Sequence, residues 1–267
     1  MTATRSMLLL PALLAVVAGS AATWKPTHGH AGEPPLRLVI NIPAGRLDVF
    51  ERGDRTRSYL VSVGRRGFET PAGSYFVNRI EWNPWFHPPK SNWARNWKIM
   101  PPGPDNPMGR VKLQFSTLLY IHGTSEEEEA RLGARASHGC VRMGEEDIRE
   151  LARLVHRYTT PSVSSKTLDE LAQPGAKNRS FALGRGVPLS VTYNIVEVRD
   201  GQIVINPDVY RKKGNSIKPQ LTAALEKAGI HPSQLDPQRL DELSRTRRAT
   251  RLTISLDTLV TSVGNQR

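Results

Sequence analysis

The 267-residue sequence predicts a mostly β domain with flanking helices, followed by a helical C-terminal extension. Short segments of alternating or β-branched apolar residues, separated by Gly and Pro, recur through residues 36–124 and are typical of strands. Helical periodicity begins only after residue 143, where an amphipathic pattern starts. From about residue 210 the composition shifts towards Lys, Arg and Gln, and two further helical patterns follow.

The composition is that of a folded, basic protein. Hydrophobic residues make up 38% of the chain, which is enough to build one sizeable core. Lys and Arg number 37 against 25 Asp and Glu, so the formal net charge is +12. No helix-turn-helix pattern or zinc-finger spacing accompanies this charge, and we therefore expect no nucleic-acid partner. Polyanions of the cell envelope, or substrates with carboxylates, fit the charge better.

The N-terminus has the pattern of a secretory signal. Arg5 precedes an apolar run at residues 7–18, and small residues suited to cleavage near Ala21 or Ala22 follow. The run is shorter than the ~20 apolar residues that span a bilayer, so we expect no stable membrane span after cleavage. An uncleaved interfacial anchor is the alternative. The sequence thus predicts a signal peptide at 1–22 and an exported protein of the periplasm or cell envelope.

Residues 23–35 contain Pro, Gly and polar residues and predict a linker. Two strands are expected within 36–53 and a third at 58–64, all rich in β-branched or alternating apolar residues. Residues 69–82 predict a turn that leads into another strand. Residues 112–124 predict one strand whose end carries His122.

Helical patterns follow the strands. Residues 144–158 place apolar side chains on one face and acidic residues in the first turn, which favours an amphipathic helix packed on the sheet. A shorter helix is expected at 165–173. Apolar alternation around Asp200-Gly201 then predicts a hairpin that completes a β domain over 36–209. Residues 210–267 form the basic extension, with helices near 217–228 and 237–251.

Cys140 is the only cysteine in the chain. Exported proteins usually hold cysteines in disulfide pairs, because their compartment oxidises thiols. A single thiol in such a place is a liability unless it has chemistry to perform, so Cys140 is a candidate nucleophile. The alternative is a buried cysteine that packs as a small hydrophobic residue.

His122 is the candidate partner of this thiol. A free cysteine has a pKa of about 8.5 and needs a base or an imidazolium to become a reactive thiolate at neutral pH. Gly139 allows a substrate to approach closely and presents backbone N–H groups to an oxyanion. Arg142 has the fork geometry that binds a carboxylate through two hydrogen bonds. With these neighbours we expect Cys140 to be a partly exposed thiolate of low pKa.

A zinc site is the alternative for His122, His138 and Cys140, since these residue types bind zinc. No fourth ligand presents itself, and we expect no metal and no cofactor. The acidic run at 126–129 follows Ser125 and is most simply a capped helix start, with steering of substrate as the other possibility.

The order of His122, fourteen intervening residues and SHGCVR at 137–142 closely resembles the signature of the YkuD family of L,D-transpeptidases. Segments 67–73 and 101–110 resemble family segments that precede the central strands and the histidine strand. The resemblance covers roughly residues 36–158. It implies a YkuD-type catalytic β-sandwich, with the hairpin through Ile205 completing it.

The resemblance also implies a reaction and a set of roles. Cys140 would attack the acyl carbon that joins the third residue of a peptidoglycan tetrapeptide stem to D-Ala, releasing D-Ala and leaving a thioester. An amine of a second stem would then resolve the thioester and link the two third residues. His122 would be the acid and base, oriented by the carbonyl of Gly123, and the N–H groups of Gly139 and Cys140 would face the oxyanion. The remaining candidate site residues, which line the site or bind substrate, are Ser137, His138 and Arg142.

Other acceptors and another function class stay open from the sequence. Water would make the protein an L,D-carboxypeptidase, and a protein lysine would tether a protein to the wall. A non-catalytic wall-binding protein could instead use the basic surface and the tryptophans. Four tryptophans lie within residues 82–97 and could stack on glycan, cover a cleft or simply pack. They are Trp82, Trp85, Trp93 and Trp97. The basic C-terminal extension is either a solvated face or a site of attraction to the wall or membrane surface.

Overall fold

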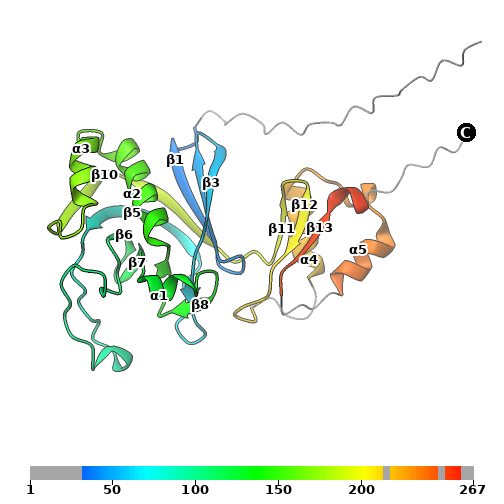
Figure 1. Ribbon diagram of the computed structural model, residues 1–267. Coiled ribbons are helices and arrows are strands. Elements are labelled where there is room, and N and C mark those ends of the chain that lie inside the picture. Colours follow the sequence, from blue (N-terminus) through cyan, green and yellow to red (C-terminus); the bar gives the residue numbers. More distant parts are fainter. Residues whose placement is uncertain (1–31, 213–216, 246–249, 260–267) are drawn as a thin grey trace, which may run out of the picture.

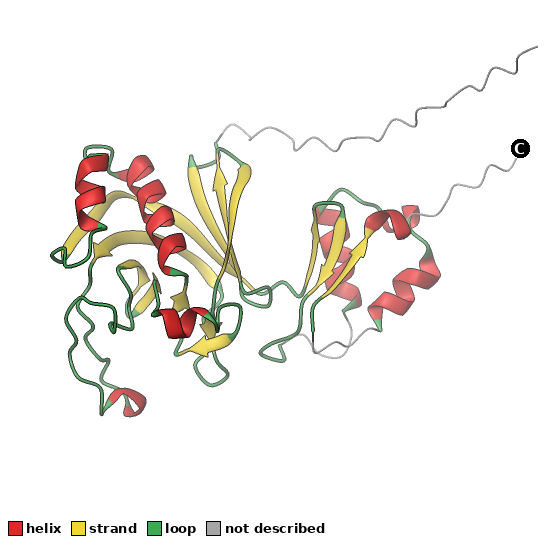
Figure 2. Cartoon of the chain, viewed as in Figure 1, coloured by secondary structure: helices red, strands yellow, loops and turns green. Residues whose placement is uncertain are grey.

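The computed structural model of the protein describes residues 32–212, 217–245 and 250–259. The expected signal peptide at 1–22 lies outside these residues, as does most of the expected linker. Within the described residues, eight strands form the main sheet, and Figures 1 and 2 show helices covering one side of it. The strands are β1 (Leu36–Asn41), β2 (Arg46–Glu51), β3 (Asp54–Leu60), β5 (Gly73–Trp82), β6 (Val111–Ser116), β7 (Leu119–His122), β9 (Val141–Arg142) and β10 (Arg179–Thr192).

The strand order of the main sheet is β3-β2-β1-β10-β5-β6-β7-β9. Neighbouring strands run antiparallel except at two places, β1 beside β10 and β7 beside β9. A short parallel pair, β4 (Val63–Gly64) with β8 (Arg135–Ser137), lies next to the end of this sheet that carries β9. The prediction of a mostly β fold with flanking helices is confirmed.

The register of the strands separates an apolar face from a polar face. One row of paired residues is fully buried and consists of Ile80, Leu113, Ile121 and Val141. The adjacent row consists of Glu81, Lys112, His122 and Arg142. Successive residues of a strand point to opposite faces, so the second row projects from the face opposite the apolar one. The candidate site residues His122 and Arg142 therefore lie on the polar face.

Helix α2 (Glu145–Thr159) covers the apolar face. Its first turn carries three acidic residues and its last turn carries His156 and Arg157, which suits the helix dipole. The apolar stripe expected from the sequence is buried against the sheet, with Ile148, Leu151, Leu154 and Val155 in it. The indole N–H of Trp82 donates to His156 Nε2 at 3.1 Å across this interface. Helix α3 (Ser165–Leu171) follows α2, and among the described residues no helix is long and apolar enough to cross a membrane.

The strand expected over residues 112–124 is two strands in the structure. β6 and β7 form an antiparallel hairpin whose turn places Leu118 at φ 62°. A non-glycine residue rarely adopts this left-handed conformation, and nothing in the composition of the segment marked the turn. The split matters for the site, because it brings His122 back beside β9.

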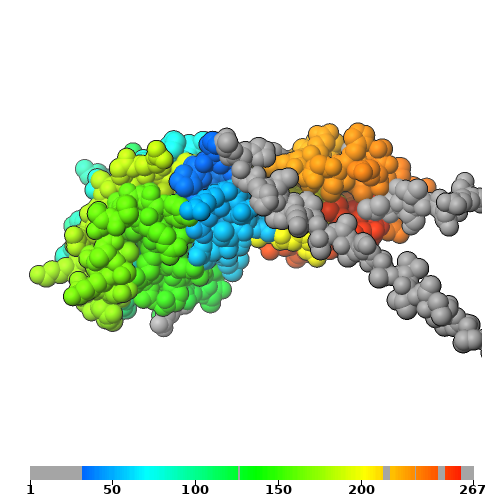
Figure 3. Space-filling model, turned by 90° about the horizontal axis from the view of Figure 1, so that it is seen from above, coloured from blue at the N-terminus to red at the C-terminus, as the bar shows by residue number. Residues whose placement is uncertain are grey.

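The hairpin around Asp200-Gly201 also forms, but its partner differs from the expectation. β11 (Val196–Arg199) and β12 (Gln202–Ile205) pair with each other, and β12 pairs with β13 (Leu252–Ser255) from the C-terminal extension. This three-stranded sheet is separate from the main sheet and packs with α4 (Lys218–Lys227), while α5 (Pro237–Ser244) lies beyond it. We call residues 196–259 the C-terminal unit. It occupies one end of the molecule in Figure 3, where its atoms are coloured from yellow through orange to red.

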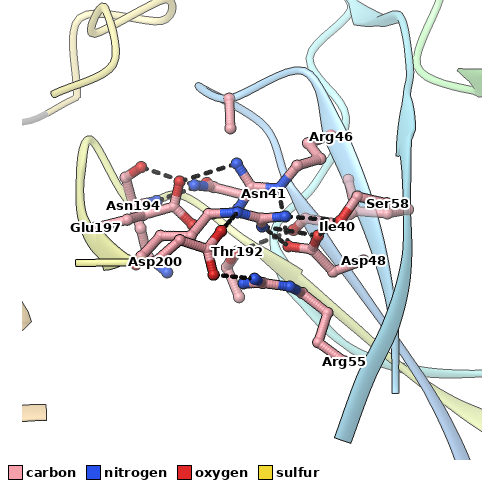
Figure 4. A network of polar contacts seen from close by, with 12 residues as sticks. Ile40, Asn41, Arg46, Asp48, Arg55, Ser58, Thr192, Asn194, Glu197 and Asp200 are labelled. Carbon is pink, nitrogen blue, oxygen red and sulfur yellow. Dashed lines mark hydrogen bonds and ion pairs between the residues drawn. The ribbon is translucent and has the colours of Figure 1, made fainter. Parts of the chain in front are cut away.

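Charged side chains join the C-terminal unit to the first strands of the main sheet (Figure 4). Arg46 forms ion pairs with both Asp48 and Glu197, and Arg199 forms a second ion pair with Asp48. Arg55 pairs with Asp200 at the tip of the hairpin. Asp48 is only 8% exposed, and its arginine partners, together with a hydrogen bond from Ser58, lower its pKa even though burial opposes this. The buried apolar cluster likewise continues from the main sheet into the unit.

Candidate active site

His122 and Cys140 come from neighbouring parallel strands. β7 ends at His122, and Cys140 immediately precedes β9, in which Val141 pairs with Ile121 and Arg142 pairs with His122. Residues in register on adjacent strands share a face, and so do residues two apart along one strand. His122 and Arg142 therefore share the polar face. Cys140 is two residues before Arg142, and its thiol lies close enough to Arg142 and Lys112, both in the polar row, for their charges to counteract the rise in its pKa that burial causes.

The turn that carries the thiol is held by its own side chains. Ser137 is buried, and its hydroxyl donates to the carbonyl oxygen of Cys140 at 2.5 Å and accepts the N–H of Gly139 at 3.1 Å. Gly139 has φ 111°, a conformation that favours glycine over residues with a Cβ atom. The Gly139 N–H is thus committed to Ser137, which differs from the expectation that it faces an oxyanion. The backbone N–H of Cys140 is then the remaining candidate donor to the oxyanion.

His122 is a buried, neutral imidazole. His122 is only 4% exposed, and its Nδ1 lies 2.6 Å from the carbonyl oxygen of Gly123. A carbonyl only accepts hydrogen bonds, so Nδ1 carries the proton and Nε2 has a free lone pair. Burial lowers the pKa of His122 to about 3, and the nearby charge of Arg142 contributes in the same direction. The imidazole is therefore a base that is unprotonated at neutral pH.

The Cys140 thiol is half-buried, and its Sγ lies 3.6 Å from the carbonyl oxygen of Leu118, to which it donates. Burial raises the pKa of the thiol. A backbone hydrogen bond from Tyr120 and the charges of Arg142 and Lys112 lower the pKa but do not outweigh burial. The expectation of a low-pKa thiolate therefore differs from the structure, which holds a neutral thiol beside a neutral imidazole.

Arg142 stands at the edge of the site and pairs with an acidic residue of α1 (Glu126–Glu129). Its Nη1 lies 2.5 Å from Glu128 Oε2, while its Nε is buried and has no hydrogen-bond partner among the described residues. An arginine offers five donors, so the pairing with Glu128 leaves capacity for a ligand. The acidic run at 126–129 is helical as expected, although Ser125 makes no side-chain capping bond.

His138 forms the side of the site that faces the tryptophan-rich segment. Its ring stacks on Trp93 with centroids 3.9 Å apart and meets Phe68 edge-on at 4.8 Å. Arg65 Nη2 lies 2.8 Å from His138 Nε2, which must accept because a guanidinium only donates. The tryptophans thus divide: Trp82 is core, Trp93 packs beside the nucleophile turn, and two others are exposed. The exposed pair is Trp85 and Trp97.

Glu145 is a neighbour of the site that the sequence did not reveal. Its carboxylate accepts the N–H of Arg110 at 3.2 Å and a backbone hydrogen bond from Thr124. A Cβ atom added to Gly123 would overlap Glu145 Oε1, so the carboxylate lies directly against the backbone that orients His122. In the sequence Glu145 was indistinguishable from the other acidic residues in the first turn of α2.

The expectation of no metal stays a prediction. The described residues contain no group of three or more His, Cys, Asp or Glu side chains placed to hold a metal ion. His122 Nδ1 already donates to Gly123, and His138 Nε2 already accepts from Arg65, which leaves one ring nitrogen on each histidine.

A thiol and a neutral imidazole on one face of a β-sheet define a candidate site for a cysteine nucleophile. The family model of the L,D-transpeptidase catalytic domain, YkuD, matches residues 35–167. A protein of Fuscovulum blasticum whose name assigns it provisionally as an L,D-transpeptidase is 36% identical over 134 residues, which cover 49% of this chain and 69% of that protein. The chain belongs to the YkuD family of L,D-transpeptidases.

Longer relatives match over part of their length. The probable L,D-transpeptidase ErfK/SrfK of Escherichia coli is 28% identical over 68% of this chain and 66% of that protein. The probable L,D-transpeptidase YbiS of the same species is 35% identical over 43% of this chain and 40% of that protein. Among solved structures, an L,D-transpeptidase from Mycobacterium smegmatis is 15% identical, with a TM-score of 0.40 over 59% of this chain and 58% of that one. The chain thus spans about two thirds of the length of ErfK/SrfK and about two fifths of the length of YbiS.

Proposed function

We propose that the protein is an L,D-transpeptidase that acts on peptidoglycan stem peptides, with Cys140 as nucleophile and His122 as acid and base. The observation that carries the proposal is the state of His122. Its Nδ1 proton is committed to the carbonyl oxygen of Gly123, which leaves the lone pair of Nε2 free to accept a proton on the face that carries the thiol. Membership of the YkuD family supports the choice of substrate and reaction.

Acylation would begin with transfer of the Cys140 proton to His122 Nε2. The sulfur then bonds to the acyl carbon that joins the third stem residue to D-Ala, and the carbonyl electrons move to oxygen, which the Cys140 N–H faces. When the tetrahedral intermediate collapses, the carbon–nitrogen bond breaks. His122 gives its proton to the departing amine of D-Ala, and a thioester remains on Cys140.

Transfer reverses these roles. The amine of a second stem attacks the thioester, His122 takes a proton from it, and the same proton returns to sulfur as the new amide forms. Arg142 would bind a carboxylate of the substrate through guanidinium donors that Glu128 does not use, since Glu128 takes up only Nη1. Ser137 would hold the shape of the nucleophile turn, and His138 would line the site.

The proposed location is the periplasm or cell envelope. The support is the signal-like sequence of residues 1–22, which precedes the described residues, together with a substrate found outside the cytoplasm. N-terminal sequencing of protein from fractionated cells tests this. Protein recovered from the cytosol with Met1 in place would contradict export.

The test of the reaction is intact-protein mass spectrometry after incubation with a carbapenem, whose strained carbonyl resembles the acyl group under attack. The expected result is one stable adduct on the wild type and none on Cys140→Ala, which removes the only thiol in the chain. We expect little adduct with a simple penicillin. In parallel, release of D-Ala from tetrapeptide stems should be lost in Cys140→Ala. Release at the wild-type rate from that variant would show that the nucleophile is another residue.

A further inference from the structure

Tyr210 links the C-terminal unit to the catalytic part of the chain. Tyr210 follows β12 and is only 6% exposed, and its hydroxyl lies between a backbone group at the end of β4 and one in the segment that follows β4. The hydroxyl donates to the carbonyl oxygen of Gly64 at 2.6 Å and accepts the N–H of Thr70 at 3.3 Å. One side chain of the C-terminal unit thus bonds both ends of a seven-residue turn, Gly64 to Thr70, in the main domain.

That turn contacts the nucleophile turn by two routes. Thr70 is fully buried, and its hydroxyl donates to the carbonyl oxygen of Gly139 at 2.9 Å while accepting the N–H of Gly64 at 2.9 Å. Gly64 also pairs with Ser137 in the β4–β8 ladder. The hydroxyl of Tyr210 is therefore two hydrogen bonds away from the peptide that joins Gly139 to Cys140.

Tyr210 is itself held by Tyr193, which directly follows β10, and through it by Asp208. Its backbone N–H donates to the hydroxyl of Tyr193 at 2.6 Å, and that hydroxyl donates to Asp208 at 2.5 Å. The two tyrosine rings stack with centroids 5.6 Å apart. Burial raises the pKa of Tyr210, so its hydroxyl stays protonated and remains a donor.

The turn from Gly64 to Thr70 has little room to adjust. A Cβ atom on Gly64 would overlap the carbonyl oxygen of Phe68, which shows how closely the chain folds back on itself. A buried backbone group that loses its partner costs free energy, so removing the Tyr210 hydroxyl should make the turn rearrange rather than leave two groups unpaired. Any such rearrangement moves Thr70, and with it the carbonyl of Gly139.

We propose that Tyr210 is a positioning residue through which the C-terminal unit holds the nucleophile turn, residues 137–140, in its reactive geometry. The proposal rests on the proposed function for the role of Cys140. It gives the C-terminal unit a part in catalysis without placing any of its residues against the substrate.

The experiment compares Tyr210→Phe with Tyr158→Phe in the full chain. Tyr158 lies in α2, on the face opposite the thiol, and donates to the Glu51 carboxylate at 2.9 Å, so its variant also loses a tyrosine hydroxyl bond but away from the turn. The first measurement is the rate of Cys140 acylation by a carbapenem. We expect a fall of about tenfold to a hundredfold in Tyr210→Phe, as for a small misplacement of a reacting group, and no change in Tyr158→Phe.

The second measurement is the rate of alkylation of Cys140 by iodoacetamide at pH 7. This small reagent needs a thiolate but no aligned acyl site. Because burial raises the pKa of the thiol, a loosened turn that admits water should increase the thiolate fraction. Alkylation should therefore become faster in Tyr210→Phe while acylation becomes slower. Loss of global stability alone moves neither rate at temperatures far below the unfolding transition.

Thr70 provides a second test if Tyr210→Phe fails to fold. Thr70→Val removes the hydroxyl that bonds Gly139 and Gly64, whereas Thr70→Ser keeps it. Slow acylation in Thr70→Val and recovery in Thr70→Ser would support the linkage. Wild-type acylation and alkylation rates in both Tyr210→Phe and Thr70→Val would overturn it. A wild type that forms no adduct contradicts the proposed function instead, and the alkylation rates then still decide whether Tyr210 holds the turn.

Discussion

His122 Nδ1 lies 2.6 Å from the carbonyl oxygen of the next residue, Gly123, so the imidazole is oriented by the backbone that it belongs to. The same carbonyl group belongs to the peptide whose N–H, at Thr124, bonds the Glu145 carboxylate. The carboxyl group of Glu145 thus lies on the far side of the peptide from the imidazole. In this arrangement one glycine peptide does the orienting that a carboxylate does in many Cys-His and Ser-His sites.

Replacing His122 with alanine should slow acylation of Cys140 by a carbapenem about 10²- to 10⁴-fold, the usual contribution of a general base. The neutral thiol of Cys140 then has no nearby acceptor for its proton. Single-turnover mass spectrometry measures the rate. His231→Ala is the control, because His231 is exposed in the C-terminal unit. Equal rates in wild type and His122→Ala would show that His122 is only a structural residue at the end of β7.

The rate of acylation should be nearly constant from pH 8 to pH 5. His122 has its pKa lowered to about 3, so it remains an unprotonated base across this range, whereas an ordinary histidine would lose its base form below pH 6.5. Rates are measured in buffers of constant ionic strength. A decline with a midpoint near pH 6.5 would show that His122 is solvated and titrates normally.

A loss of the folded state at low pH must be distinguished from protonation of His122. Unfolded histidines bind protons below about pH 6.5, but burial lowers the pKa of His122 to about 3 and that of His156 to about 4. The unfolded chain therefore binds more protons than the folded chain between these values, and stability falls as the pH drops below 6.5. Near-ultraviolet circular dichroism at each pH separates this loss of stability from a loss of the base.

The β-rich fold, the helix over 144–158 and the pairing of His122 with Cys140 could be predicted from local patterns. Alternation, turn residues and the motif spacing all act over short stretches of chain. The partner of the Asp200-Gly201 hairpin could not be predicted, because β13 pairs with β12 across some fifty residues and no local pattern says which strand another strand will join. The break between β6 and β7 depends on one positive φ angle at Leu118, which has no signature in composition.

The finer features of the site depend on contacts between distant segments. The motif identified Gly139 as a source of an N–H group, but the choice of Ser137 as its acceptor appears only when the turn is folded. Likewise the pKa of Cys140 follows from burial by surrounding strands, and the sequence favoured the opposite direction. Glu145 and Tyr210 lie in no recognised motif. Thr70 lies in the family-like segment 67–73, but its bond to Gly139 joins residues 69 positions apart and appears only in the folded chain.

Trp93→Ala should weaken substrate binding more than it slows the chemical step. The indole stacks on His138 beside the nucleophile turn, and an aromatic contact of this kind contributes about 0.5–1.5 kcal/mol, or roughly a twofold to tenfold effect. We expect a higher KM for tetrapeptide stems with a similar kcat. Trp97→Ala is the matched control from the same segment, because Trp97 packs on Phe86 and is exposed. Equal KM values for Trp93→Ala and wild type would place the indole outside substrate binding.

Gly139→Ala should abolish most acylation, although a methyl group has room there. The nearest atom to an added Cβ is 3.6 Å away, so the obstacle is the backbone, whose φ of 111° an alanine adopts only with strain. Relaxing that strain rotates the peptide that bonds Thr70 and turns the Cys140 N–H away from the acyl oxygen. Gly229→Ala is the control, since Gly229 also has a positive φ, 73°, and open space around it in the C-terminal unit. Both variants should lose about 1–2 kcal/mol of stability in urea unfolding, as expected for an L-residue in a left-handed conformation. Only Gly139→Ala should lose the carbapenem adduct; an adduct formed at the wild-type rate would mean that the geometry of this turn does not limit attack by the thiol.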